Sequence, residues 1–208
     1  MSENHYTPAP APSAPTPPPK APSRARQWQL LKLLGSWLLA LLVALLLARY
    51  AFQSYQVFGQ SMEPALQEGD YLIISKLGAT WADFRHQDYI PKRGDIVVVD
   101  STLNGTRLIK RVIALPGERI TVSGGEVSVY NDEHPNGFDP YEVLGLEPRF
   151  TSGQLTELVP QDHVFVIGDN RQAGGSLDSR NELGPIPTDN IVGHLVLRLY
   201  PFSDITRF

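Results

Sequence analysis

The chain has 208 residues, which is enough for one ordinary domain and an additional segment, and it contains no cysteine. Disulfide frameworks and thiolate metal sites are therefore excluded. The formal net charge of -4 is uneven, because residues 1–49 carry a net charge of +4 and the rest of the chain carries -8. Nucleic-acid binders usually carry positive charge on their folded part, so nucleic acid is not expected as a partner.

The chain begins with a proline-rich segment, since residues 1–23 hold eight of the 18 prolines. Such a segment cannot bury enough apolar surface to offset the entropy lost on ordering. We expect residues 1–28 to form a disordered tail that acts as a spacer; a proline-motif ligand for a partner is the alternative.

A long apolar run follows, with no charged residue from Leu33 to Ala48. A helix of about 20 residues spans a bilayer core. A buried core helix would show a polar stripe, which this run lacks. A cleaved signal peptide would end in small residues, but the run ends in Ala48-Arg49-Tyr50-Ala51. The sequence therefore predicts one transmembrane helix over residues 29–50.

The charges around this run predict its orientation. Four basic residues precede the apolar run, namely Lys20, Arg24, Arg26 and Lys32. Positive charge is retained on the cytoplasmic side of membranes. We therefore expect a cytoplasmic N-terminus in the plasma or inner membrane, membrane lipid as a partner, and residues 51–208 outside the cytoplasm.

Residues 51–208 are predicted to be mainly β, as a folded sheet or barrel. Apolar, β-branched runs alternate with turns rich in glycine, proline and aspartate. The predicted strands are 55–58, 71–75, 95–100, 106–115, 119–122, 126–130, 163–168 and 191–200. No convincing helical periodicity follows residue 52. Residues 131–162 are irregular and polar, and we predict that 119–162 form a small inserted subdomain.

Metal and cofactor chemistry is not indicated by the sequence. The five histidines have no metal-ligand spacing, so neither a metal nor a cofactor is expected. A Ser-His-Asp triad needs no sequence proximity, yet no histidine has a context that singles it out.

A serine activated by lysine is the more specific possibility. Ser61 lies in the loop sequence GQSMEPALQEGD, just after the apolar run. Lys110 lies in TRLIKRVIAL, where strand alternation places it on one face with Leu108, Val112 and Ala114. A desolvated lysine can lose its proton near neutral pH and activate a serine. A polar turn around Ser61 and an edge lysine that deters aggregation remain the alternatives.

A third cluster, GDNRQAGGSLDSRNELGPI, covers residues 168–186. Its Asp, Asn and Ser side chains could simply bond to the backbone of their own turn. Alternatively, Ser176, Asp178 and Arg180 hold a catalytic group in place. Composition alone leaves both interpretations open.

These segments together resemble the type I signal peptidases, the membrane-anchored Ser-Lys proteases of bacteria. The resemblance rests on four motifs in the family's order, over residues 57–186 and after one N-terminal span: Ser61–Leu66, Lys92–Val99, Lys110–Glu118, and Gly168–Arg171 with Ser176–Arg180. It implies an all-β catalytic domain with a smaller inserted domain. It also implies a serine endopeptidase that removes signal peptides from secretory preproteins.

The resemblance implies a role for each matched residue. Ser61 would be the nucleophile and unprotonated Lys110 the general base. Ser176 would hydrogen-bond to Lys110, supported by Asp178 and Arg180. In the family the oxyanion hole uses the nucleophile's N–H and sometimes a hydroxyl two residues earlier, where this chain has Gly59.

The implied substrate is a signal peptide with small residues at positions -1 and -3, bound as an added strand. We expect four residues to form the pocket walls: Phe58, Met62, Leu66 and Ile109.

One departure concerns the last motif. Four residues separate Arg171 from Ser176, where the family usually has two. The glycines Gly174 and Gly175 would allow an outward bulge. The other register would give the role of Ser176 to Ser179.

Three other functions compete with a general signal peptidase. A self-cleaving repressor is disfavoured by the anchor and by the lack of a DNA-binding domain. A catalytically inactive, membrane-tethered peptide-binding domain is disfavoured by the presence of both Ser61 and Lys110. A dedicated peptidase for one substrate, of the pilin or conjugation type, remains open.

Overall fold

The computed structural model describes residues 24–101, 103, 105–201 and 205–208. It divides into two units, one ending at Val43 and the other covering Ala44–Phe208. Most of the predicted tail, 1–28, lies outside the described residues. Helix α1 spans Arg24–Tyr50, so it begins inside the range predicted as tail rather than at residue 29.

Helix α1 contains the candidate membrane span, Arg26–Tyr50, a stretch of 25 residues in which an 18-residue window has a mean hydropathy of 2.4. At 1.5 Å per residue such a helix is about 37 Å long, which exceeds a hydrocarbon core of about 30 Å. Its leucines and tryptophans are exposed, so no protein core within the described residues takes them up. The helix is long and apolar enough to cross a bilayer.

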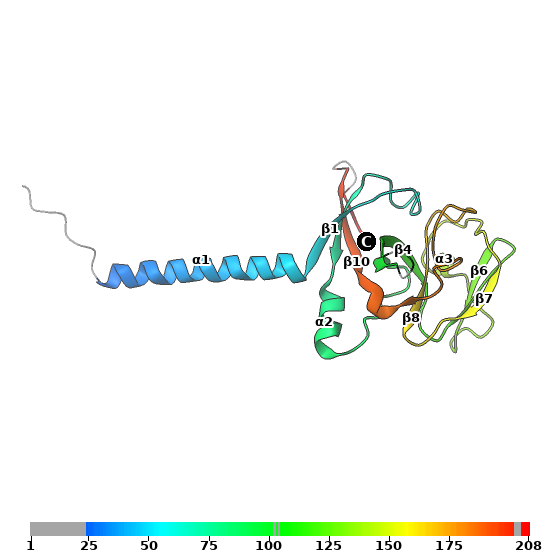
Figure 1. Ribbon diagram of the computed structural model, residues 1–208, viewed down its shortest axis with the longest axis horizontal. Coiled ribbons are helices and arrows are strands. Elements are labelled where there is room, and N and C mark those ends of the chain that lie inside the picture. Colours follow the sequence, from blue (N-terminus) through cyan, green and yellow to red (C-terminus); the bar gives the residue numbers. More distant parts are fainter. Residues whose placement is uncertain (1–23, 102, 104, 202–204) are drawn as a thin grey trace, which may run out of the picture. The chain divides into compact units, whose positions relative to one another are not determined.

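The unit Ala44–Phe208 is mainly β, which confirms the predicted fold class. Its larger sheet has the antiparallel order β1-β2-β10-β3-β4-β8-β9, with β11 beside β10. Figure 1 labels β1, β10, β4 and β8 of this sheet. The strands are β1 (Phe52–Gln56), β2 (Tyr71–Ser75), β3 (Ile96–Asp100), β4 (Arg107–Ala114), β8 (His163–Ile167), β9 (Ile186–Pro187), β10 (Ile191–Tyr200) and β11 (Thr206–Arg207).

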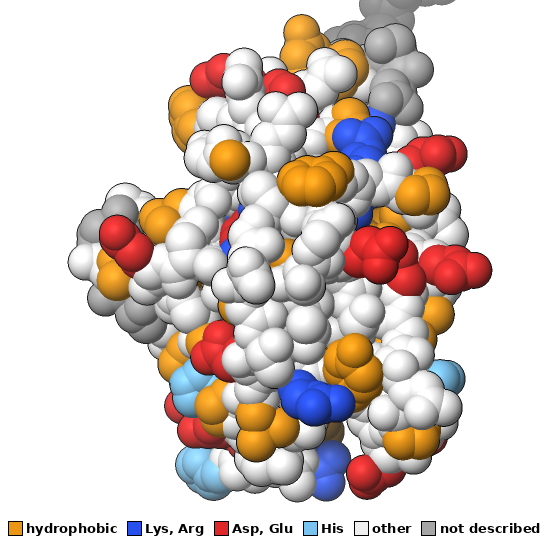
Figure 2. Space-filling model, turned by 90° about the vertical axis from the view of Figure 1, so that its right-hand side faces the viewer, with side chains coloured by type: hydrophobic (Ala, Val, Ile, Leu, Met, Phe, Trp, Pro, Cys, Tyr) orange, Lys and Arg blue, Asp and Glu red, His pale blue; other side chains and the backbone are white. Residues whose placement is uncertain are grey.

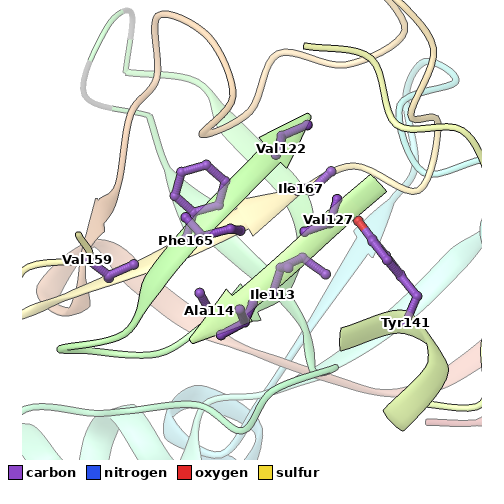
Figure 3. Packing of buried hydrophobic residues seen from close by; sticks show 10 residues of the cluster. Ile113, Ala114, Val122, Val127, Tyr141, Val159, Phe165 and Ile167 are labelled. Carbon is purple, nitrogen blue, oxygen red and sulfur yellow. The ribbon is translucent and has the colours of Figure 1, made fainter. Parts of the chain in front are cut away.

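A second, three-stranded sheet of order β6-β5-β7 comprises β5 (Arg119–Ser123), β6 (Glu126–Tyr130) and β7 (Leu155–Leu158). The short helix α3 (Pro140–Val143) follows β6 in the chain. Figure 3 shows how side chains of β4 and β8 meet those of β5, β6 and α3 in one apolar cluster. This cluster joins the second sheet to the sheet that carries Lys110.

Helix α2 (Leu77–Arg85) corrects the expectation that no helix follows residue 52. None of its residues is buried. A helix shows a periodic apolar pattern in the sequence when its apolar side chains face a core. The apolar side chains of α2 do not face the core, so this pattern does not identify the helix. Strand β7 was also missed, and a 3-10 turn spans Thr188–Asn190.

Candidate active site

Ser61 lies in the loop that connects β1 to β2. The base of this loop is closed by hydrogen bonds from Val57 N to Asp70 O and from Gly69 N to Val57 O, at 2.9 and 3.0 Å. Met62 and Leu66 are buried in the apolar cluster below it. The loop is therefore held from underneath, while Ser61 itself stays partly exposed.

Lys110 is among the largest fully buried side chains of the described residues, with 1% of its surface exposed. The alternation predicted for β4 holds from Leu108 to Val112, since Leu108 and Val112 pack in one apolar cluster and Ile109 in another. It was wrong for Ala114, which packs in the same cluster as Ile113, beyond a register shift in the pairing of β4 with β8. Lys110 Nζ lies 2.8 Å from Ser61 Oγ and 2.8 Å from the carbonyl oxygen of Ile109. The fold thus brings together two residues that are 49 positions apart in the chain.

Burial lowers the pKa of Lys110 from 10.5 to about 8; the carboxylates of Asp178 and Asp169 oppose this shift, and Arg180 adds to it. A carbonyl oxygen can only accept a hydrogen bond, so Nζ donates to Ile109 O. A neutral amine then still has its lone pair for the hydroxyl proton of Ser61. This pair can generate a serine nucleophile near neutral pH.

The backbone of the serine loop is fixed by Asn170, a residue that the sequence did not single out. Asn170 N donates to Ser61 O at 3.0 Å, and Asn170 Nδ2 donates to Gln60 O at 3.2 Å. The N–H of Ser61 donates to no other residue in the described part of the chain. This N–H is therefore available as a hydrogen-bond donor. Gly59, two residues earlier, has a φ of +80° and no side-chain donor.

Gly168, where β8 ends, is packed between Ser61 and Ser176. A Cβ on this glycine would lie 2.4 Å from the backbone oxygen of Ser61 and 2.2 Å from Ser176 Oγ. Both contacts are closer than real Cβ atoms allow. Gly168 N also donates to Asp178 Oδ2 at 2.9 Å. The motif's glycine therefore permits a close approach that no other residue would.

Ser176 is buried beside this glycine, but it does not make the hydrogen bond to Lys110 that the resemblance implies. Among the described residues, its Oγ has no hydrogen-bond partner. Lys110 instead points at Ser61 and at its own neighbour's carbonyl. Ser179, the alternative, accepts a hydrogen bond from Val166 N at 3.0 Å, so its hydroxyl supports β8.

Asp178 and Arg180 form a buried, fully bonded ion pair. Asp178 accepts from the Arg180 side chain at Nε (2.9 Å) and Nη2 (2.8 Å) and from Arg180 N (3.1 Å). Arg180 Nη1 also donates to the carbonyl oxygens of Ser152 and Arg171, at 3.1 and 2.9 Å. Through Arg171 the pair holds the loop 168–186 together, and through Ser152 it fixes this loop to a separate segment of the chain.

A second ion pair, which the sequence did not predict, joins β4 to the same loop. Arg111 Nε and Nη2 donate to Asp169 at 2.8 and 2.6 Å, and Nη1 donates to Gly94 O at 2.8 Å. Both Arg111 and Asp169 lie in the motifs named above, but their pairing is a long-range contact that spacing does not reveal.

The four residues predicted as pocket walls differ in their exposure. Phe58 is exposed and Ile109 is half-buried, whereas Met62 and Leu66 lie in the core and can contribute only to a pocket's floor. A cavity of about 680 Å³ adjoins the serine loop and was not predicted; it is lined by Gln60, Glu63, Pro64, Arg149, Phe150, Asp169, Asn170, Arg171 and Gln172.

One edge of β4 is open next to Lys110. Strand β3 pairs with β4 from Arg107 to Arg111 on one side. On the other side, β8 pairs only with Arg111, Val112 and Ala114. Residues 107–110 therefore have no strand partner on this side within the described part of the chain. In that same part, no group of three His, Asp or Glu residues could hold a metal ion.

Comparison with known proteins gives one consistent result. A family model described as "Signal peptidase, peptidase S26" matches residues 30–200. Signal peptidase I P of Bacillus subtilis subsp. natto is 36% identical over 180 residues, covering 81% of this chain and 90% of that protein. Probable signal peptidase I-1 of Synechocystis is 35% identical, covering 85% and 86%. A crystal structure of a signal peptidase I from Enterococcus faecalis is 27% identical with a TM-score of 0.38, covering 51% of this chain and 97% of that chain.

Proposed function

The chain belongs to the signal peptidase family, peptidase S26, and is a serine endopeptidase; from this premise we propose that it cleaves signal peptides from secreted preproteins with Ser61 as nucleophile and Lys110 as general base. The observation that carries the proposal is the distance of 2.8 Å between Lys110 Nζ and Ser61 Oγ, at a lysine with 1% exposure. A buried lysine needs a reason, because desolvation of its charge is costly.

The acylation step follows from this geometry. Lys110 Nζ accepts the Ser61 hydroxyl proton while Oγ attacks the carbonyl carbon of the scissile peptide bond. The resulting oxyanion accepts a hydrogen bond from Ser61 N–H. When the C–N bond breaks, the Lys110 ammonium gives its proton to the leaving amine, which is the new N-terminus. The signal peptide stays bound to Ser61 as an ester.

The deacylation step uses the same lysine. Neutral Lys110 accepts a proton from a water molecule, whose oxygen attacks the ester carbon. The C–Oγ bond breaks, the proton on Lys110 returns to Ser61 Oγ, and the signal peptide leaves as a carboxylic acid that releases its own proton to solvent. Asn170 would hold the serine backbone through both steps, because its N–H donates to the carbonyl oxygen of Ser61, and Gly168 leaves room for that oxygen.

The open edge of β4 is a suitable place for the substrate backbone. An extended peptide could add to residues 107–110 by main-chain hydrogen bonds and pass over Ser61. Ile109 and Phe58 would then contact its side chains, with Met62 and Leu66 below. Small substrate residues at -1 and -3 would fit this surface, because Met62 and Leu66 are packed in the core and leave only shallow space above them.

The candidate span Arg26–Tyr50 would anchor this peptidase in the membrane. A signal peptide is itself an apolar segment that enters the bilayer, so its cleavage site is presented close to the membrane surface. Only residues 51–60 separate the span from the nucleophile. An anchored enzyme therefore meets its substrate where the substrate emerges. Basic residues before the span favour a cytoplasmic N-terminus.

The test is cleavage of purified preproteins by the full-length protein in proteoliposomes, with the new N-terminus sequenced. Cleavage should follow a small residue, and Ser61→Ala, the matched control, should release no product. Several unrelated preproteins should be processed; cleavage of one alone would indicate a dedicated peptidase. Full activity of Ser61→Ala would contradict the assigned nucleophile.

A further inference from the structure

Helix α2 has its apolar residues on the outside. Leu77, Trp81 and Phe84 are 51%, 61% and 76% exposed. Their spacing of four and three residues places them on one face of the helix. The rings of Trp81 and Phe84 stack with centroids 5.8 Å apart. Together these three side chains form the patch that we call the α2 patch.

The opposite face of α2 packs on the protein through small residues. Gly78, Ala79 and Ala82 are half-buried, and a Cβ on Gly78 would lie 2.3 Å from the ring of Tyr89. The helix cannot rotate to bury its aromatic rings, because these would have to replace glycine and alanine at a tight contact. Contiguous exposed apolar patches of this kind mark interaction surfaces.

The α2 patch lies next to the end of the candidate membrane span. Thr80 Oγ1 donates to the carbonyl oxygen of Tyr50 at 3.2 Å, and Lys76 N donates to Ala51 O at 2.8 Å. Tyr50 is the last residue of the span. The side chains of Tyr50 and Phe52 are exposed as well. Exposed aromatic side chains therefore lie both at the end of the span and on α2, and hydrogen bonds join the two.

We propose that the α2 patch inserts into the headgroup region of the same bilayer that holds the anchor. This inference rests on the proposed membrane anchoring. The span exceeds the hydrocarbon thickness, so its end lies among the headgroups. Tryptophan is enriched at that depth, and amphipathic helices lie there in the membrane plane. Arg85, whose guanidinium carbon is 5.9 Å from the Trp81 ring centroid, can reach lipid phosphates.

A second membrane contact would restrict how the catalytic unit moves on its anchor. One span fixes only a point, about which the unit could tilt. The α2 patch adds a second point, and α2 packs against β10 in the middle of the larger sheet. On the face shown in Figure 2, hydrophobic side chains are instead scattered among polar and charged ones. That face is suited to water.

The absence of cysteine permits a clean test in the full-length chain. Phe84→Cys carries an environment-sensitive fluorophore at the α2 patch, and Leu158→Cys is the matched control on β7. Both positions are exposed, so neither substitution disturbs the core. Each protein is placed in vesicles of phosphatidylcholine and phosphatidylglycerol that contain lipids with a nitroxide quencher near the headgroup. Preprotein cleavage is measured in the same vesicles.

We expect the nitroxide lipids to quench the fluorophore at position 84 and to leave the fluorescence at position 158 unchanged. Adding Trp81→Ser to Phe84→Cys should reduce the quenching. Equal fluorescence at both positions would overturn the inference, and so would self-quenching at position 84 that rises with protein density, which would indicate a second copy of the chain. Because cleavage is recorded separately, active vesicles without quenching reject only the lipid contact, whereas quenching without cleavage rejects only the proposed function.

Discussion

The proton on Lys110 controls the proposed reaction. Burial lowers its pKa to about 8, so the neutral fraction falls by about tenfold for each pH unit below that value. We expect kcat/KM to fall accordingly on the acidic side. Lys110→Arg should lose activity by on the order of a thousandfold or more at every working pH, since a guanidinium keeps its proton. A pH series of cleavage rates tests both, and activity retained by Lys110→Arg would exclude the Ser-Lys mechanism.

The same burial predicts an effect on stability. The folded-state pKa of about 8 lies below the ordinary 10.5, so the unfolded chain binds more protons between these two values. Stability therefore rises with pH across this window, and below pH 8 the whole penalty of roughly 3 kcal/mol opposes folding.

Lys110→Met should remove this penalty. The variant should melt at a higher temperature than the wild type at pH 7 and should be inactive. The difference in melting temperature should shrink as the pH approaches 10.5, the ordinary value. A difference that is independent of pH would contradict a buried ammonium as its cause.

Ser176 and Ser179 should respond differently to alanine. Ser179→Ala leaves the buried N–H of Val166 without its partner, which costs about 1–3 kcal/mol of stability. Ser176→Ala removes no hydrogen bond described in the structure and should barely change the melting temperature. If the Ser176 hydroxyl assists Lys110 during the reaction, kcat should fall with KM unchanged. Melting curves and steady-state kinetics separate the two effects.

The candidate site was only partly predictable from the sequence. Strand alternation indicated that Lys110 is buried, and resemblance paired it with Ser61. From the sequence alone, Ser179→Ala would be expected to have little effect, because no neighbouring residue in the chain indicates that the Ser179 hydroxyl supports β8. The contacts of Asn170 with the serine loop were not predictable either, because they join residues more than a hundred positions apart in the chain.

At the scale of elements, the end of β8 determines where the serine loop sits. Gly168→Ala should displace the backbone of Ser61, because the added Cβ would meet a carbonyl oxygen that cannot rotate away. A displacement of about 1 Å can cost a hundredfold in rate. Gly35→Ala is the control, since a Cβ there meets nothing within 4 Å. Wild-type kcat in Gly168→Ala would show that the close approach is not needed.

Elements with a buried face were predicted best. The bounds of β2, β6 and β10 match the sequence-based expectation. Each of these strands has a repeated pattern of buried positions, so the spacing of its apolar residues identifies the strand in the sequence. Strand β7 alternates between exposed and half-buried positions, and α2 faces outward, so neither leaves such a mark. Pairing with β5 stabilises β7, and that contact is not local.

At the scale of the whole molecule, the prediction concerns topology. If the N-terminus is cytoplasmic, protease added to spheroplasts should digest or release the chain beyond residue 51 and leave an N-terminal tag protected. The basic residues before the span are the physical reason. Detection uses one antibody for each end. A protected C-terminal end with a digested tag would reverse the orientation.

The unpaired side of β4 has a consequence for the range of substrates. A substrate that binds through its main-chain N–H and C=O groups uses groups that all peptides share. Its side chains then affect binding only where they would collide with the surface of the enzyme. An enzyme built in this way tolerates great diversity and rejects chiefly two things: bulk next to the scissile bond, and a proline whose missing N–H interrupts the ladder. Under the proposed binding mode, one such site can bind peptides that have no common sequence.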